Sequence, residues 1–195
     1  MTAAPQILDP DHPPARLALA YARAGDRPMW SAYFALEARL AQAGQRTSQP
    51  MMAQLRLAWW RDRLKSPVRD WPKGEPMLAA LANWDGERAA LVALVDGWEA
   101  ALVGEDAGHA LAEARVSTML ALARLLGVID GPAIERAARD WQALGPRARA
   151  QSLPRSMRPL AVLRVLALRD AARQRGVNSS LADAMALLRL ALTGH

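Results

Sequence analysis

Apolar side chains recur at intervals of three and four residues along most of the chain, which is the spacing of one face of an α-helix. Segment 27–43 has this pattern most clearly. One face of that segment carries Met29, Tyr33, Leu36 and Leu40, with Trp30 and Phe34 alongside. We expect this segment to form a helix that packs in the core of the protein.

Glycine and proline residues divide the pattern into helical segments. The predicted helices cover residues 15–24, 27–43, 51–65, 75–83, 86–103, 106–126, 132–144, 160–174 and 180–192. The loops between them are short, which favours antiparallel neighbours. No repeat of fixed period is evident, so the pattern predicts a compact bundle of about eight or nine helices rather than a helical solenoid.

The residue composition also favours an all-α fold. Apolar residues make up 52% of the chain, yet Phe, Tyr and Trp together make up only 5%, and most of these are Trp. Residues that favour strands are therefore scarce. A chain of 195 residues without a low-complexity linker predicts one domain. We expect this domain over residues 15–195, after a proline-rich leader over residues 1–14.

The chain contains no cysteine, which excludes disulfides, thiolate metal ligands and thiol nucleophiles. No stretch reaches the roughly 18 uninterrupted apolar residues that a membrane span requires, and residues 1–14 do not have the pattern of a signal peptide. These observations predict a cytoplasmic protein without a transmembrane segment. Peripheral membrane association remains open.

The net charge is +6, and nearly all basic residues are arginine. Arginine suits phosphate and carboxylate partners, so an anionic ligand or surface is one interpretation. Genomic base composition is the other, because the arginines are scattered along the chain. Nucleic-acid binding is not predicted, since the sequence has no basic stripe with interleaved stacking aromatics.

Segment 51–65 carries the most informative side chains. Its candidate anion pocket consists of Arg56, Trp59, Trp60, Arg61 and Arg63. Successive residues of a helix are about 100° apart, which puts Arg56 and Arg63 within the same arc of about 100° as the apolar residues of this segment. That apolar stripe consists of Met52, Leu55 and Trp59.

A guanidinium group inside an apolar stripe must find carboxylates, carbonyl groups or a bound anion. One interpretation is a pocket in which Arg56 and Arg63 hold a diphosphate or a carboxylate of a partner. The other is an internal ion pair with a carboxylate of this chain, and structural ion-pair networks of this kind often mimic sites. The candidate carboxylates are Glu37, Asp96 and Glu99.

Residues 50–64 resemble the Arg-Leu-x-Trp-Trp-Arg-Asp helix of the squalene/phytoene synthase family. Residues 33–40 resemble the helix that precedes it in that family. Leu153-Pro154 and residues 158–163 resemble the family's late Leu-Pro and Arg-Pro-Leu stretch. The resemblance implies an isoprenoid-synthase-like helical fold. In active members of the family it implies two Asp-rich motifs that hold Mg²⁺ and the substrate diphosphate.

The acidic residues lack the spacing that this metal chemistry requires. Carboxylates that share one Mg²⁺ on a helix must lie on the same face, three or four residues apart. No acidic residue has another four positions later, and Asp96 with Glu99 is the only pair three apart. Glu135 and Asp140 are five apart. We therefore predict no metal ligands and no catalytic residues.

Other candidates have structural interpretations. Asp106 and His109 have metal-ligand spacing, but the chain has only three histidines, so we interpret Asp106 as the N-terminal cap of a helix. We expect three further tryptophans, Trp84, Trp98 and Trp141, to be core anchors.

Two functions follow from the sequence. The first is a non-catalytic relative of the family that binds a prenyl or other lipid ligand, or a protein partner, without a cofactor. The family offers a precedent for the partner, since it includes an assembly factor for respiratory complex I. The alternative is a residual or active prenyl transferase, which would join two prenyl diphosphates head to head and would need Mg²⁺.

Overall fold

The computed structural model describes residues 11–45, 50–104, 106–144 and 152–174, and within these ranges it contains helices and no strand. The predicted all-α fold is confirmed. The α-helices are α1 (Pro13–Ala20), α2 (Arg27–Gln45), α3 (Pro50–Lys65), α4 (Pro76–Leu81), α5 (Arg88–Val103), α6 (His109–Leu125), α7 (Gly131–Trp141) and α8 (Arg158–Gln174). Three 3₁₀ helices complete the described part: η1 (Val68–Asp70), η2 (Ala82–Glu87) and η3 (Arg155–Met157).

Seven of the described α-helices have eight residues or more, which is fewer than the eight or nine helices predicted. The helix expected at 75–83 shortens to the six residues of α4 and continues as the tighter η2. Asn83, Asp85 and Gly86 are poor helix formers and account for this change. The helix expected at 180–192 lies outside the described residues.

The first helix also begins earlier than predicted. α1 starts at Pro13, inside the leader expected over residues 1–14. Pro13 and Pro14 occupy the first turn of α1. Backbone N–H groups have no partner within the helix at these positions, so proline loses no hydrogen bond there. Residues 1–10 of that leader lie outside the described residues.

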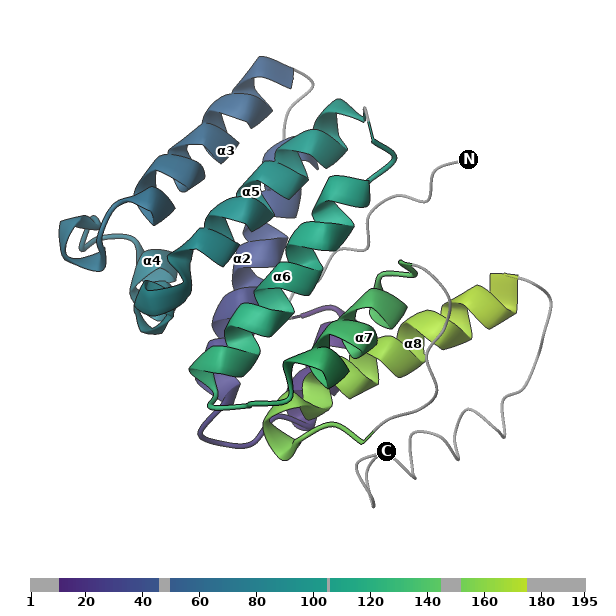
Figure 1. The fold of residues 1–195 in the computed structure, drawn as a ribbon. Helices are drawn as coiled ribbons and strands as arrows, with labels where there is room; N and C mark the ends of the chain where they lie inside the picture. Colours follow the sequence, from purple (N-terminus) through teal and green to yellow (C-terminus); the bar gives the residue numbers. More distant parts are fainter. Residues whose placement is uncertain (1–10, 46–49, 105, 145–151, 175–195) are drawn as a thin grey trace.

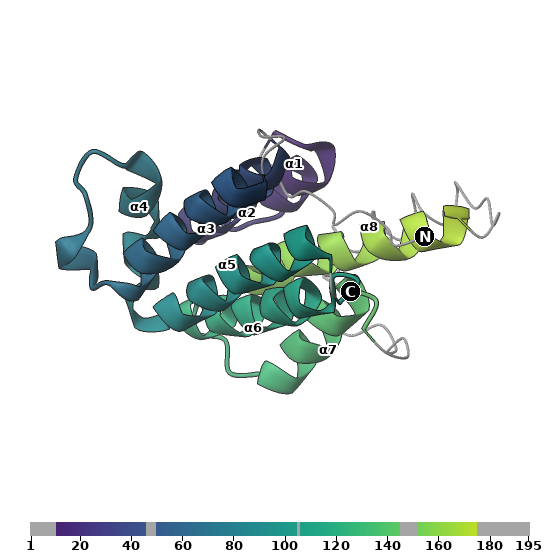
Figure 2. The same ribbon diagram turned by 90° about the horizontal axis from the view of Figure 1, so that it is seen from above.

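The helices α3, α5, α6, α7 and α8 follow one another as packed neighbours, as Figure 1 shows. α2 lies behind α5 and α6 in this view, and Figure 2 shows it on the opposite side of the molecule from α7. α2 also packs against α1, α3 and α4. Its several neighbours and its extensive burial make α2 one of the helices that organise the described core.

The core is built from alanine, leucine and a few large aromatic anchors. The predicted face of α2 is buried: Trp30, Tyr33, Phe34, Leu36 and Leu40 are all inaccessible or nearly so, while Met29 is half-buried. Trp84, Trp98 and Trp141 are also buried, which confirms their prediction as core anchors. The indole N–H of Trp30 donates a hydrogen bond of 3.0 Å to the carbonyl of Ser156 and so ties α2 to η3.

α5 and α6 pack closely because α5 has a glycine at the contact. A Cβ atom added to Gly97 would lie 2.8 Å from the Cα of Leu111 and 3.1 Å from the Cβ of Ala114. No side chain fits at that distance from another backbone, so Gly97 permits this approach of the two helices.

No helix in the described ranges combines the length and the apolar character that a membrane crossing requires.

Candidate functional site

The buried face of α3 is apolar and consists of Ala53, Leu57, Trp60 and Leu64. Arg61, which is half-buried, lies beside this face toward α5. The predicted stripe, to which Arg56 and Arg63 belonged, was assigned to the wrong side of the helix, because both sides carry apolar residues and periodicity alone cannot choose between them. Burial of the stripe would have removed the two guanidinium groups from water, which is costly without partners.

The burial of the two arginines in that stripe differs from the prediction. Arg56 is exposed, and Arg63 is only half-buried. The Nε of Arg63 has no hydrogen-bond partner among the described residues. The prediction that both arginines lie within the buried stripe is thus wrong.

Arg61 is the arginine of α3 that pairs with α5. Its Nε donates to the Asp96 carboxylate at 2.5 Å, and its Nη2 donates to the Glu99 carboxylate. These hydrogen bonds raise the pKa of Arg61 above its usual value, with the bond to Glu99 contributing most. The ion pair with Asp96 and Glu99 that the sequence analysis considered for Arg56 and Arg63 is formed by Arg61 instead.

Glu37 also has an arginine partner, which comes from α6. The Nε of Arg115 donates to Glu37 Oε1 at 2.9 Å and its Nη2 to Oε2 at 2.8 Å. Tyr33 donates its hydroxyl to Oε1 and Trp98 its indole N–H to Oε2, both at 3.0 Å. The guanidinium lies 5.4 Å from the ring of Trp98, within cation–π range. These bonds close a buried polar network around Glu37 within the described bundle.

Burial within this network shifts two ionisable groups. Loss of water raises the pKa of Tyr33 well above its usual value, and the neighbouring charge of Glu37 raises it further. Burial lowers the pKa of Arg115, but the charge and hydrogen bonds of Glu37 outweigh this effect, so its pKa is raised overall. Both groups keep their ordinary protonation state in the folded protein, which suits a structural role.

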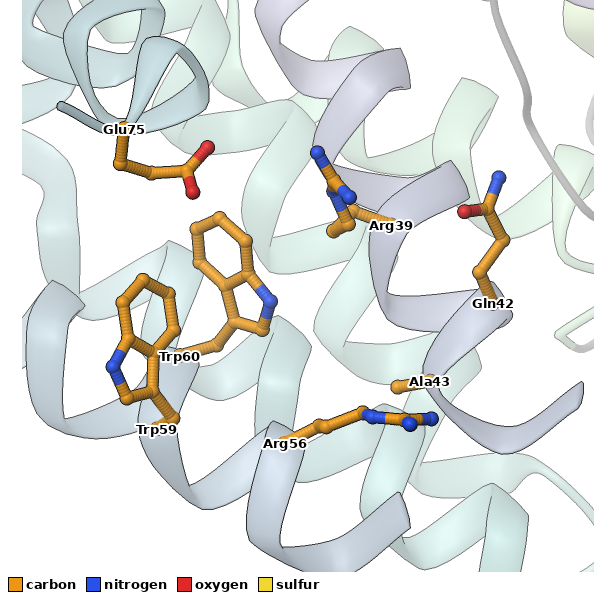
Figure 3. Close-up of a pocket in the computed structure, with 7 residues that line it drawn as sticks. All are labelled: Arg39, Gln42, Ala43, Arg56, Trp59, Trp60 and Glu75. Atoms are coloured by element: carbon orange, nitrogen blue, oxygen red, sulfur yellow. The ribbon is translucent and has the colours of Figure 1, made fainter. Parts of the chain in front are cut away.

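A surface pocket of about 360 Å³ lies between α2, α3 and the start of α4. Its lining consists of Arg39, Gln42, Ala43, Arg56, Trp59, Trp60 and Glu75. Figure 3 shows the two indole rings on one side of the pocket and the α2 side chains on the other. The rings of Trp59 and Trp60 meet edge to face with their centroids 4.9 Å apart, which stiffens this apolar wall.

Two arginines contribute the positive charge of the pocket. Arg39 and Arg56 form no hydrogen bond or ion pair with any residue that the structure describes. The single carboxylate, Glu75, accepts a hydrogen bond of 3.2 Å from the backbone N–H of Met77 as the N-cap of α4. Two guanidinium groups beside two indoles and one carboxylate give a site that suits an anion with an apolar portion.

The structure brings together only part of the predicted site. Arg56, Trp59 and Trp60 line the pocket, whereas Arg61 and Arg63 do not. The remaining lining residues come from α2 and from the N-cap of α4 and were not predicted: they are Arg39, Gln42, Ala43 and Glu75. The spacing of Arg39, Gln42 and Ala43 places them on one side of α2, and this pattern could have indicated a shared surface. No local pattern in the sequence indicates that Glu75 joins them.

The carboxylates considered for metal binding have protein partners. Asp140 lies 2.8 Å from Arg164, and Glu135 lies 3.1 Å from Arg139. Within the described ranges, no group of three or more acidic or histidine side chains could hold a metal ion.

Asp106 has the capping role predicted for it. Its carboxylate accepts hydrogen bonds from the backbone N–H groups of Gly108 at 3.0 Å and Ala110 at 2.6 Å, at the start of α6. These bonds, the one from Ala110 first, lower the pKa of Asp106. Asp106 thus caps α6 as predicted, but from two residues before Gly108, which is the N-cap residue.

Comparison with known proteins does not assign the chain to a family. No protein-family model matches its sequence, and neither a curated protein nor a solved structure is significantly similar to it.

Proposed function

We propose that this protein is a non-catalytic binding protein that holds an anionic, partly apolar ligand in the pocket between α2, α3 and α4. The ligand class is a prenyl diphosphate or a lipid with a phosphate headgroup. The observation that carries the proposal is the pair Arg39 and Arg56, two guanidinium groups without a partner in the described protein, beside the indoles of Trp59 and Trp60.

The chemistry of the pocket matches both parts of such a ligand. Guanidinium groups bind phosphate oxygens through paired, charge-assisted hydrogen bonds. The indoles supply an apolar wall for the first carbons of a prenyl or acyl chain. A volume of about 360 Å³ lies at the lower end of the range for small-molecule pockets, so the remainder of a long chain would extend beyond it.

Catalysis is not part of the proposal because the described carboxylates offer no site for Mg²⁺. Glu37 pairs with Arg115, and Asp96 and Glu99 pair with Arg61. A prenyl transferase of the squalene/phytoene synthase type would need such carboxylates free and facing one cavity. In this proposal the chain keeps an isoprenoid-synthase-like scaffold, as its resemblance to that family implies, and uses it for binding. Its location is cytoplasmic, and a protein partner remains compatible with the bound state.

The test is titration of the protein with farnesyl diphosphate and geranylgeranyl diphosphate, with and without Mg²⁺, by calorimetry and tryptophan fluorescence. We expect binding that does not require Mg²⁺, and no release of pyrophosphate. Arg39→Gln and Arg56→Gln should each weaken binding by about tenfold or more, the effect of one lost charged hydrogen bond.

Arg69→Gln is the matched control. It removes the same charge from an exposed arginine outside the pocket, which only approaches Asp70 at 3.7 Å. If all three substitutions weakened ligand binding equally, the loss would come from the change in net charge. That result would contradict binding in the pocket. Mg²⁺-dependent release of pyrophosphate would contradict the proposed binding function and support the alternative, a prenyl transferase.

A further inference from the structure

The outward side of α3 carries four large apolar side chains. They are Met51, Met52, Leu55 and Trp59, which are between 40% and 71% exposed and which we call the outer patch. They lie between positions 51 and 59 of the helix, opposite its buried face. A group of this kind on one helix usually marks an interaction surface.

The end of α5 extends this apolar region. α3 and α5 pack side by side and run in opposite directions (Figure 1). Because Arg61 pairs with Asp96 and Glu99, residues near 55 on α3 lie level with residues near 103 on α5. Leu102 and Val103 are exposed there. Apart from Ile129, every exposed large apolar side chain in the described ranges belongs to α3 or to this end of α5.

Positive charge borders the outer patch. Arg56 is exposed next to Leu55, and Arg63 and Lys65 follow on the last turns of the same helix. The one acidic side chain of α3, Asp62, is exposed on the same side, three residues after Trp59, so three cations face one carboxylate around the patch. An apolar helix face with methionine, leucine and tryptophan, bordered by cations, is the pattern of helices that lie in the interface of a bilayer with anionic lipids.

The shape of this surface favours a bilayer over a protein. α3 is an outer helix at the edge of the described bundle, as Figure 1 shows. The outer patch is a single convex helix face and offers no groove that could receive a helix of a partner. A second copy whose α3 pairs in parallel would bring Arg56, Arg63 and Lys65 toward their own counterparts, and like charges oppose that contact.

We propose that the outer patch docks the protein on the surface of a bilayer that contains anionic phospholipids. Met51, Met52 and Leu55 enter the boundary of the acyl chains, and the arginines of α3 contact lipid phosphates. Trp59 belongs to both the outer patch and the pocket, so docking brings the pocket to the membrane surface. The role of the membrane as the source of the ligand rests on the proposed function, but docking itself does not.

The experiment is cosedimentation of the full chain with vesicles of phosphatidylcholine, with and without phosphatidylglycerol. We expect binding to the anionic vesicles, weak binding to pure phosphatidylcholine, and release as salt is raised. Met52→Gln/Leu55→Gln should lower the partition coefficient by about tenfold or more, because two apolar anchors are lost.

Ile129→Gln is the matched control, since Ile129 is 97% exposed and lies between α6 and α7, away from the outer patch. It should leave vesicle binding unchanged, and circular dichroism should confirm that both variants fold. Three results would overturn docking: no cosedimentation, equal binding by Met52→Gln/Leu55→Gln, or a dimer that this variant abolishes while vesicles stay unbound.

The two proposals fail in different ways. Met52→Gln/Leu55→Gln leaves the pocket lining unchanged and should still bind farnesyl diphosphate. If the protein binds vesicles but no prenyl diphosphate, the docking proposal stands and the proposed ligand is wrong. If it binds prenyl diphosphate but no vesicles, docking is overturned alone.

Discussion

Arg115 and Glu37 are 78 residues apart in the sequence and form a two-point ion pair at the centre of the bundle. Their side chains are 4% and 0% exposed. Each charge has left water, so each depends on the other for its stability. Tyr33 and Trp98 satisfy the remaining hydrogen-bonding capacity of the carboxylate.

Loss of one partner should therefore be costly. We expect Arg115→Met to lower the free energy of unfolding by about 3–5 kcal/mol, because Glu37 would remain buried without a cation. Urea denaturation measures this change. Arg124→Met is the control on the same helix: Arg124 pairs with Glu87 in the same two-point manner but is 58% exposed. Its loss should cost less than about 1 kcal/mol. Equal losses would contradict the role of burial.

Stability should fall at high pH because of Tyr33. Burial raises the pKa of its hydroxyl above the usual value of 10.0. Above pH 10 the unfolded chain loses this proton while the folded protein retains it, so the unfolded state gains stability as pH rises. We expect the free energy of unfolding to decline from about pH 10 upward.

Tyr33→Phe isolates this effect. The variant should be less stable than the wild type near neutral pH by about 1–2 kcal/mol, because a hydrogen bond to a buried charge is lost. Its stability should then decline less steeply with pH than that of the wild type. If the free energy of unfolding declined equally with pH in the variant and the wild type, the pH dependence would come from groups other than Tyr33.

Gly97→Ala should weaken the contact between α5 and α6. The new methyl group would meet the backbone of Leu111, which cannot move aside alone. We expect a loss of about 1–3 kcal/mol in the free energy of unfolding, the usual range for an overpacked core. Gly131→Ala is the control, because nothing lies within 4 Å of the added Cβ. It should be neutral or stabilising by up to about 1 kcal/mol. A stable Gly97→Ala would mean that the helices can separate freely.

Arg61→Gln separates stability from binding. Arg61 and its partners are partly exposed, so we expect a loss of less than about 1 kcal/mol in the free energy of unfolding. Its affinity for prenyl diphosphates should match that of the wild type, since Arg61 does not line the pocket. A tenfold loss of affinity in this variant would show that Arg61 takes part in ligand binding.

The sequence was sufficient for the fold class and for one of the helices that organise the core. The large apolar residues of segment 27–43 form one wide face, and α2 buries that face together with most of its alanines. Segment 51–65 was ambiguous, because Leu55 and Trp59 on one side compete with Leu57 and Trp60 on the other. Periodicity alone cannot decide which of these two sides is buried. The deciding factor is the free-energy cost of burying Arg56 and Arg63, which lie on the side of Leu55 and Trp59.

Partners that are distant in the sequence could not be predicted. The carboxylates Glu37, Asp96 and Glu99 were correctly singled out as candidates for internal ion pairs, but their arginines were not. Arg115 lies on an Ala-rich helix without any local sign of burial, and its pairing depends on how α6 packs against α2. Glu75 reaches the pocket only through the turns between α3 and α4.

The network around Glu37 also sets the relative positions of three helices. One carboxylate receives hydrogen bonds from α2, α5 and α6, and each bond requires its donor within a few tenths of an ångström. A slip of one helical turn, about 5.4 Å, would break the bonds of the helix that moved. Alanine-rich faces are smooth and would tolerate such sliding, so this polar network helps to fix the register of α2, α5 and α6 against one another.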